Sequence, residues 1–170
     1  IQAVQPNWLP VVYVNSSAAV KAFCGEHGGS ACTSSNAAKV CKRVLDQGQR
    51  ILFIPDEHLG ANTARDLGLP DAAVATYDPG KIWGGVGAER LAGARVLVWK
   101  GYCHVHTFTG DDITLARRRY PDAKIIVHPE TPAAATRLAD AHGSTSQIIK
   151  YVAAAPAGST VIIGTEQHLV

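Results

Sequence analysis

The densest group of reactive side chains lies in residues 99–108, which read WKGYCHVHTF. Cys103, His104 and His106 fall within four positions of one another, directly after the run RVLVW at 95–99. Such residues could hold a zinc ion, could form a catalytic thiol with a histidine base, or could simply end a buried strand. Adjacent residues of a strand point to opposite faces, which argues against Cys103 and His104 sharing one ion.

Polar and titratable residues also follow the other apolar runs of the chain. They are Asn15, the stretch Pro55–Gly60, the pair His128 and Glu130, and residues 165–168. Ligands of parallel sheets collect beyond the carboxyl ends of the strands, so these residues are expected at a functional edge. A structural protein would more often end its strands in Gly, Asn and Ser turns.

The alternation of these runs with Ala-rich stretches predicts the elements that position the side chains. Strands are expected at 11–14, 51–54, 96–99, 124–127 and 160–163, and helices at 17–23, 35–47, 61–67, 111–119, 132–141 and 146–154. Strands that are apolar on both faces and separated by helices indicate parallel sheets covered on both sides. The predicted class is therefore α/β, with three-layer αβα units built on short parallel sheets.

The sequence contains an internal repeat. Residues 32–40 (CTSSNAAKV) resemble residues 143–151 (GSTSQIIKY), and residues 51–60 (ILFIPDEHLG) resemble residues 161–170 (VIIGTEQHLV). The offsets of 111 and 110 residues indicate two copies of one α/β unit, related by internal pseudo-symmetry. The predicted units are residues 1–100 and residues 101–170, the second shortened at its C-terminus. The alternative is two generic βαβ units whose short motifs converge.

Ser34 and Thr145 occupy matched positions in this repeat, each near an expected helix start. Hydroxyls in such places cap free backbone N–H groups. Several such donors at the positive end of a helix also form a site for anions. The two residues are therefore either ordinary caps or a pair of anion contacts.

The composition limits the class of protein. No apolar run approaches the roughly 20 residues that cross a bilayer. A net charge of +2, without a basic stripe among aromatic residues, argues against nucleic acid as a partner. The chain starts with Ile and holds no Met, so we expect a processed or truncated piece. Four cysteines without a C-x-x-C pair predict thiols or thiolate ligands in a reducing, cytoplasmic protein.

Seven segments taken together resemble the quinolinate synthase family. They are VVYVNSSAAVKA, CTSSNAAKV, ILFIPDEHLG, WKGYCHVH, RRRYPDAKIIVHPE, ADAHGSTSQIIK and VIIGTE, in family order along nearly the whole chain. The resemblance implies three similar α/β units around a pseudo-threefold axis, of which this chain holds the second and most of the third. It implies condensation of iminoaspartate with dihydroxyacetone phosphate to quinolinate in NAD biosynthesis. It also suggests as a partner an L-aspartate-oxidising enzyme that supplies iminoaspartate.

The cofactor that this resemblance implies is a [4Fe–4S] cluster, bound by one cysteine from each unit with one iron open to substrate. Cys103 matches the family's middle ligand, whereas His104 and His106 are its neighbours and not ligands. The remaining cysteines have no ligand role: Cys24, Cys32 and Cys41. The chain thus holds one of three cluster ligands, and the segments that carry the others are expected to lie outside it.

The same resemblance assigns roles to residues at the strand tips. Tyr13 and Asn15 match residues that contact substrate, and Tyr13 is the family's candidate acid–base group. His128 and Glu130 match binding and proton-transfer residues. Two further matches contact anionic groups of the substrate: Ser34 and Thr145. Because two cluster ligands lie outside the chain, the isolated chain is expected to be inactive, and the alternative function is a truncated, catalytically inactive α/β scaffold that binds small anions.

Overall fold

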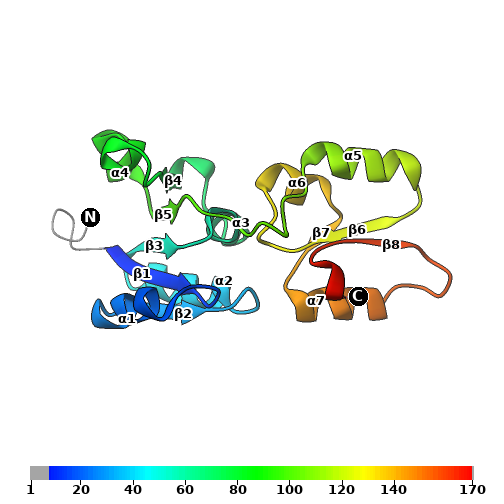
Figure 1. Cartoon of the computed structure of the whole chain (residues 1–170), viewed down its shortest axis with the longest axis horizontal. Helices are drawn as coiled ribbons and strands as arrows, with labels where there is room; N and C mark the ends of the chain where they lie inside the picture. Colours follow the sequence, from blue (N-terminus) through cyan, green and yellow to red (C-terminus); the bar gives the residue numbers. More distant parts are fainter. Residues whose placement is uncertain (1–7, 170) are drawn as a thin grey trace. The chain divides into compact units, whose positions relative to one another are not determined.

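The computed structural model describes residues 8–169, and these form two compact units that meet in the sequence between Tyr102 and Cys103. Each unit has its own sheet and its own covering helices (Figure 1). The expected repeat copies are residues 1–100 and 101–170, and residues 1–7 of the first and residue 170 of the second lie outside the described residues. That the two units are copies of one ancestral unit stays a prediction.

Unit 1 is built on a five-stranded parallel sheet with the order β2-β1-β3-β5-β4. Its strands are β1 (Trp8–Tyr13), β2 (Ser30–Cys32), β3 (Arg50–Ile54), β4 (Val74–Tyr77) and β5 (Val96–Trp99). Because every strand is parallel to its neighbour, all carboxyl ends point to one edge of the sheet. The α/β class with parallel sheets is confirmed.

The helices of unit 1 cover both faces of this sheet. They are α1 (Ala18–Glu26), α2 (Ala37–Asp46), α3 (Glu57–Asp66) and α4 (Ala88–Gly93), with 3₁₀ turns at η1 (Asp71–Ala73) and η2 (Ile82–Gly85). Phe53 packs on one face with residues of α2 and α3. Leu52 packs on the other face with Val20 of α1 and Leu91 of α4. Successive strand residues point to opposite faces, so a continuous apolar run supplies two cores at once.

The helix expected from Ala61 begins four residues earlier, at Glu57. Asp56 is its N-cap, and its Oδ1 accepts a hydrogen bond of 2.7 Å from the backbone N–H of Leu59. A buried Asp in this place satisfies a backbone donor that would otherwise lack a partner. The stretch Pro55–Gly60 directly follows β3, as expected, and residues 57–60 form the first turn of α3.

Unit 2 has a three-stranded parallel sheet with the order β7-β6-β8. Its strands are β6 (Lys124–Val127), β7 (Ala141–His142) and β8 (Val161–Gly164), and its helices are α5 (Gly110–Arg119), α6 (Ala133–Leu138) and α7 (Thr145–Ala153), followed by η3 (Gln167–Leu169). Helices α5 and α6 lie on one side of the sheet and α7 lies on the other (Figure 1). Ile125 and Val127 pack with Ile113 of α5 and Ala135 of α6.

Several short elements are absent from the sequence prediction, namely β2, β4, β7 and α4. The helix expected to run to Ala141 ends at Leu138, because the chain turns there and Ala141 pairs with Ile126 of β6. Strands of two or three residues are too short to show a periodicity of their own. Within residues 8–169, no helix combines the length and the apolar character needed to span a membrane.

Candidate functional site

The centre of the candidate site is the edge of unit 2 where β6 ends. The backbone N–H of His128 donates to Gly164 of the neighbouring strand β8 at 2.9 Å, which holds the start of the loop against the sheet. The backbone N–H of Thr131 then donates to the carbonyl of His128 at 3.0 Å. This hydrogen bond closes a turn around Pro129 and Glu130 and returns the Glu130 side chain towards the sheet edge.

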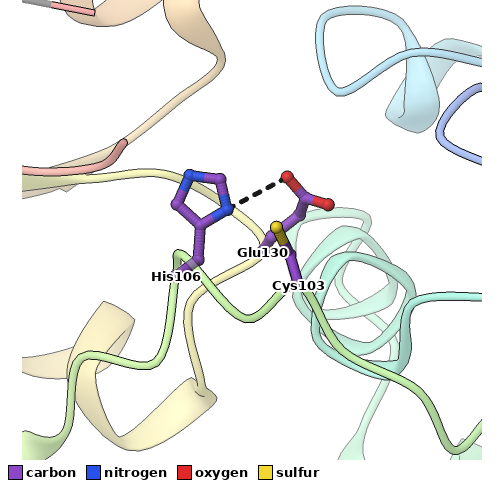
Figure 2. A group of neighbouring side chains, drawn as sticks. All are labelled: Cys103, His106 and Glu130. Carbon is purple, nitrogen blue, oxygen red and sulfur yellow. Dashed lines mark ion pairs between the residues drawn. The ribbon is translucent and has the colours of Figure 1, made fainter. Parts of the chain in front are cut away.

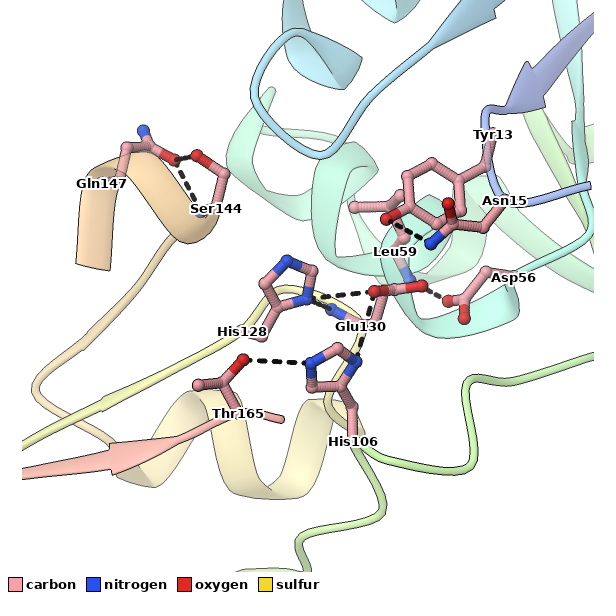
Figure 3. Close-up of polar contacts among 10 residues, drawn as sticks. All are labelled: Tyr13, Asn15, Asp56, Leu59, His106, His128, Glu130, Ser144, Gln147 and Thr165. Carbon is pink, nitrogen blue, oxygen red and sulfur yellow. Dashed lines mark hydrogen bonds and ion pairs between the residues drawn. The ribbon is translucent and has the colours of Figure 1, made fainter. Parts of the chain in front are cut away.

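One carboxylate oxygen in this turn lies between two imidazole rings. Oε2 of Glu130 is 3.2 Å from Nδ1 of His128 and also 3.2 Å from Nδ1 of His106 (Figure 3). The two rings stack, with centroids 4.2 Å apart and planes 13° apart. All three side chains are buried, with exposed fractions of 2% for Glu130, 4% for His128 and 6% for His106. A carboxylate buried to this degree requires such partners.

The pKa of Glu130 results from two opposed influences. Burial, the larger single influence, would raise the pKa, but the contacts and charges of His106 and His128 together outweigh it. The net effect lowers the pKa from 4.5 to about 2. The carboxylate is therefore ionised at neutral pH inside a buried site, where it can hold a cation or orient a proton donor.

A thiol completes this group. Ligand atoms of Cys103, His106 and Glu130 all lie within 4.8 Å of one another (Figure 2). Thiolate, imidazole and carboxylate are the common protein ligands of transition metals, so these three could hold a metal ion. His104 is exposed and does not belong to the group. The zinc site considered from the sequence, with Cys103, His104 and His106, is therefore wrong in one residue, since Glu130 and not His104 lies beside the other two.

Cys103 itself lies four residues beyond the end of β5 and is the first residue of unit 2. It is partly exposed, and like the other three cysteines it is a thiol and not part of a disulfide. Those three are buried in unit 1. Burial raises the pKa of Cys24, and raises the pKa of Cys32 and of Cys41 to about 12 each. Among the cysteines, Cys103 alone combines accessibility with other ligand groups close by.

Sequence reasoning missed the part played by His106 and Thr165. The backbone N–H of His106 donates to the carbonyl of Cys103 at 3.1 Å, so the C-x-x-H spacing forms one turn that puts both side chains on the site. Nε2 of His106 is 3.2 Å from Oγ1 of Thr165, which directly follows β8. The C-x-x-H spacing was a usable signal for His106. The contact with Thr165, 59 residues away, depends on the folding of unit 2 and has no local sequence signal.

In unit 1, Tyr13 and Asn15 lie at the carboxyl end of β1 as expected from the sequence. Tyr13 is the last residue of the strand and is 5% exposed, whereas Asn15 is exposed. The side-chain amide of Asn15 donates to the phenol oxygen of Tyr13 at 3.2 Å (Figure 3). This contact fixes the direction of the phenol group and leaves the carbonyl oxygen of the Asn15 amide able to accept another hydrogen bond.

The hydroxyl turns before α2 and α7 differ in structure. Ser34 lies three residues ahead of the first helical residue, Ala37, and the N-cap of α2 is Asn36. Thr145 is the first residue of α7, and the N-cap there is Ser144. The prediction that Ser34 and Thr145 occupy equivalent positions is therefore wrong with respect to the helix starts. The loops that follow β2 and β7 differ in length, which shifts the register of the two motifs.

The hydrogen bonds within these two turns also argue against Ser34 and Thr145 as the helix caps. Oδ1 of Asn36 accepts hydrogen bonds from the backbone N–H and the hydroxyl of Thr33, at 2.7 and 3.2 Å. Oε1 of Gln147 accepts from the backbone N–H of Ser144 at 2.8 Å and from its hydroxyl at 2.9 Å (Figure 3). The turns are thus held by amide side chains. Ser34 is half-buried and Thr145 is exposed, and a role in anion binding stays a prediction for both.

Parallel α/β units with buried ionisable residues at the carboxyl edge of a sheet are typical of enzymes that act on small molecules. Over residues 1–170 the chain matches the family model described as quinolinate synthetase A protein, NadA. The chain therefore belongs to the quinolinate synthase family, and the recognition made from the seven sequence segments is confirmed.

Curated relatives named quinolinate synthase support this assignment. The chain is 51% identical over 163 residues to the protein of Corynebacterium glutamicum, 47% over 163 residues to that of Acidobacterium capsulatum and 48% over 163 residues to that of Bacillus subtilis. In each case the match covers 95% of this chain. It covers 41% of the first relative and 44% of the other two, so the chain spans less than half the length of these proteins.

Proposed function

We propose that this chain supplies part of the active site of a quinolinate synthase, which condenses iminoaspartate with dihydroxyacetone phosphate to quinolinate in NAD biosynthesis. The observation that carries the proposal is the buried contact of Glu130 with His106 and His128 at the end of β6, in a chain that belongs to this family. Condensation and dehydration require groups that take up and release protons near neutral pH. Imidazoles paired with an ionised carboxylate are suited to this role.

We infer different tasks for the residues at the two sheet edges. His128 and Glu130 bind substrate and transfer protons, and Tyr13 acts as an acid–base group with its phenol oriented by Asn15. Asn15 also contacts the substrate. The substrates are a dicarboxylate and a phosphate ester, and Ser34 and Thr145 donate hydrogen bonds to their anionic groups. Hydroxyls close to the N-termini of α2 and α7 suit this task because the backbone N–H groups there favour anions.

The cofactor of this proposal is a [4Fe–4S] cluster, for which Cys103 supplies one ligand. The partly exposed thiol with Glu130 and His106 beside it fits such a role, whereas the buried thiols of unit 1 do not. When bound, the cluster supplies an iron with an open position that acts as a Lewis acid towards a carbonyl or carboxylate. Glu130 and His128 would then orient the substrate and move protons beside that iron.

The proposal includes a location and a supplier of substrate. Thiols that are not joined in disulfides are typical of the reducing cytoplasm, so we place the protein there. Iminoaspartate is an unstable imine, and an enzyme that oxidises L-aspartate would have to supply it. Neither nucleic acid nor a membrane is part of the proposed function.

The test uses a chimaera in which this chain replaces the matching segment of the Bacillus subtilis relative, with which it shares 48% of 163 residues. After anaerobic purification we would measure iron, sulfide, visible absorbance and the formation of quinolinate from the two substrates. We expect four iron atoms per cluster and quinolinate formation close to that of the relative. The 170-residue chain alone should form no quinolinate.

A chimaera that folds and binds the cluster but forms no quinolinate would contradict the proposal. The alternative, an inactive scaffold that binds small anions, predicts that result together with retained binding of a dicarboxylate. Titrating quinolinate against the same preparation therefore separates the two functions. A chimaera with Cys103→Ser gives the matched preparation without a cluster.

A further inference from the structure

His106 is the one member of the buried cluster for which the proposed function has no task. Its ring is 6% exposed, and both of its nitrogens face polar atoms of unit 2. A histidine buried only for packing would not need two partners at opposite ends of the ring. The question is therefore what the contacts of His106 do for Glu130 and His128.

The protonation of the cluster has a geometric constraint. Oε2 of Glu130 lies 3.2 Å from Nδ1 of both histidines, and a carboxylate oxygen is attracted only to a nitrogen that carries a proton. The backbone N–H of Glu130 also points to Nδ1 of His128, at 3.4 Å, and this contact requires that nitrogen to be bare. The two contacts of His128 thus need opposite protonation states. If Nδ1 of His128 is bare and accepts from the backbone, a proton on Nδ1 of His106 still gives Oε2 of Glu130 an attractive partner.

The position of Thr165 makes that protonation state accessible. Its hydroxyl is 3.2 Å from Nε2 of His106 and can either donate or accept a hydrogen bond. By donating, it allows a neutral His106 to keep its proton on Nδ1, opposite Glu130. Among the described residues, Nδ1 of His106 has no aligned hydrogen-bond partner, and Oε2 of Glu130, 3.2 Å away, is the charged atom it faces.

We propose that His106, held by Thr165, is a positioning residue that fixes the Glu130 carboxylate and the stacked ring of His128 for catalysis. Three supports act on the His106 ring: the turn from Cys103, the hydroxyl of Thr165 and the stack on His128 at 4.2 Å. Because reactive groups displaced by about 1 Å can lose roughly 100-fold in rate, such supports matter as much as the reacting groups. The kinetic part of this inference rests on the proposed function, but its structural part does not.

The structural test is nitrogen-15 NMR of the histidine side chains in the 170-residue chain at one fixed pH. We expect a directly bound proton on Nδ1 of His106. In Thr165→Val the ring signals of both His106 and His128 should move, although Thr165 contacts only His106 of the two. In Thr165→Ser, which keeps the hydroxyl, they should stay in place. A bare Nδ1 on His106, or equal spectra for the Val and Ser variants, would overturn the proposal.

The kinetic test uses the chimaera. His106→Gln should lower kcat about 100-fold and leave KM within about twofold, because it displaces the reacting groups and leaves the anion contacts in place. Thr165→Val should lower kcat about tenfold and Thr165→Ser should restore it. His104→Gln, the same change at an exposed position two residues away, is the control and should leave kcat unchanged. Equal effects of His104→Gln and His106→Gln, or a loss confined to KM, would contradict the positioning role.

If His106→Gln does not fold, the comparison of Thr165→Val with Thr165→Ser still tests the positioning role, because each variant differs from Thr by a small change. If the chimaera forms no quinolinate at all, the proposed function fails, and the NMR measurement still tests the positioning of Glu130 by His106. The two failures can therefore be told apart.

Discussion

The carboxyl edges of the two sheets carry different kinds of polar side chain. The edge of unit 1 presents a phenol, an amide and a hydroxyl, in Tyr13, Asn15 and Ser34, and two of these three are not buried. The buried carboxylate of Asp56 at this edge serves as the N-cap of α3. The edge of unit 2 presents His128 and Glu130 in a fully buried group with His106. Neutral donors at an accessible edge can bind an anion without a large desolvation cost. Buried ionisable groups at the edge of a sheet are typical of sites where chemistry takes place.

This difference predicts a division of labour, in which unit 2 supplies the buried carboxylate and imidazoles and unit 1 supplies the accessible binding residues Asn15 and Ser34, together with the phenol of Tyr13. The cysteines follow the same division, since three are buried with raised pKa values in unit 1 and the accessible one begins unit 2.

The largest effect is expected for Cys103→Ser in the chimaera, because it removes the one accessible thiol beside Glu130. Cluster absorbance should be abolished, while Cys32→Ser and Cys41→Ser should retain it. Visible spectra with iron and sulfide analysis check this. Loss of the cluster in Cys32→Ser as well would show that the assignment of the ligand to unit 2 is wrong.

Alkylation should distinguish the same thiols in the native 170-residue chain. At pH 8 a thiol with a pKa of about 12 is thiolate to about one part in ten thousand, and the thiolate is the nucleophile. Iodoacetamide should therefore modify Cys103 first, with Cys32 and Cys41 reacting at least about 1,000-fold more slowly. Their rates should rise as the pH is raised towards 12. Peptide mass spectrometry gives the order, and equal labelling of all four in native protein would contradict the burial of the other three.

Glu130→Gln should lower kcat in the chimaera by about 100- to 10,000-fold, the range for loss of a group that transfers protons. The amide keeps the shape of the carboxylate but removes its charge from between the two imidazoles. KM should change far less than kcat, because Glu130 is one of several substrate contacts. Initial rates over a range of both substrates check this, and a wild-type kcat would remove Glu130 from the reaction.

Many residues of the candidate site could be predicted from the sequence, because the apolar runs that predict the strands also show where each strand ends. His128 directly follows Val127, and Asn15 lies two residues after Tyr13, so the tip residues could be named directly. The contact between His106 and Thr165 could not, since these residues are 59 positions apart and only the folding of unit 2 brings them together. The register of Ser34 and Thr145 also failed, because similar motifs follow loops of different length.

Ser34→Ala and Thr145→Ala should each weaken quinolinate binding by about 1–3 kcal/mol, the range for a hydrogen bond to a charged group. Melting temperatures should change little, since Asn36 and Ser144 are the N-caps of the helices. Calorimetric titration of the chimaera gives the dissociation constants. Unchanged affinity with a lowered melting temperature would make both residues structural.

The smallest effect is expected for Asp140→Asn, a change of carboxylate to amide in unit 2 outside the site. The backbone N–H of Ile125 donates to Asp140 at 2.8 Å and, with Arg117 and Lys124 nearby, lowers its pKa. The variant should lose about 1 kcal/mol of unfolding free energy, reduced by solvent screening, with kcat unchanged. Because the folded-state pKa is depressed, this difference should be present above the unfolded-state pKa and vanish as the pH falls through the folded-state value. Urea unfolding at neutral and acidic pH measures this difference in unfolding free energy. A loss of kcat in Asp140→Asn would show that the effect of Glu130→Gln is not specific to the site.

The most direct test of the division of labour is steady-state kinetics of Glu130→Gln and Ser34→Ala, measured side by side in the chimaera over a range of substrate concentrations. We expect that Glu130→Gln lowers kcat at least about 100-fold with a much smaller change in KM, and that Ser34→Ala raises KM with kcat nearly unchanged. Equal losses of kcat in both variants, or a loss in Glu130→Gln confined to KM, would contradict this division of labour.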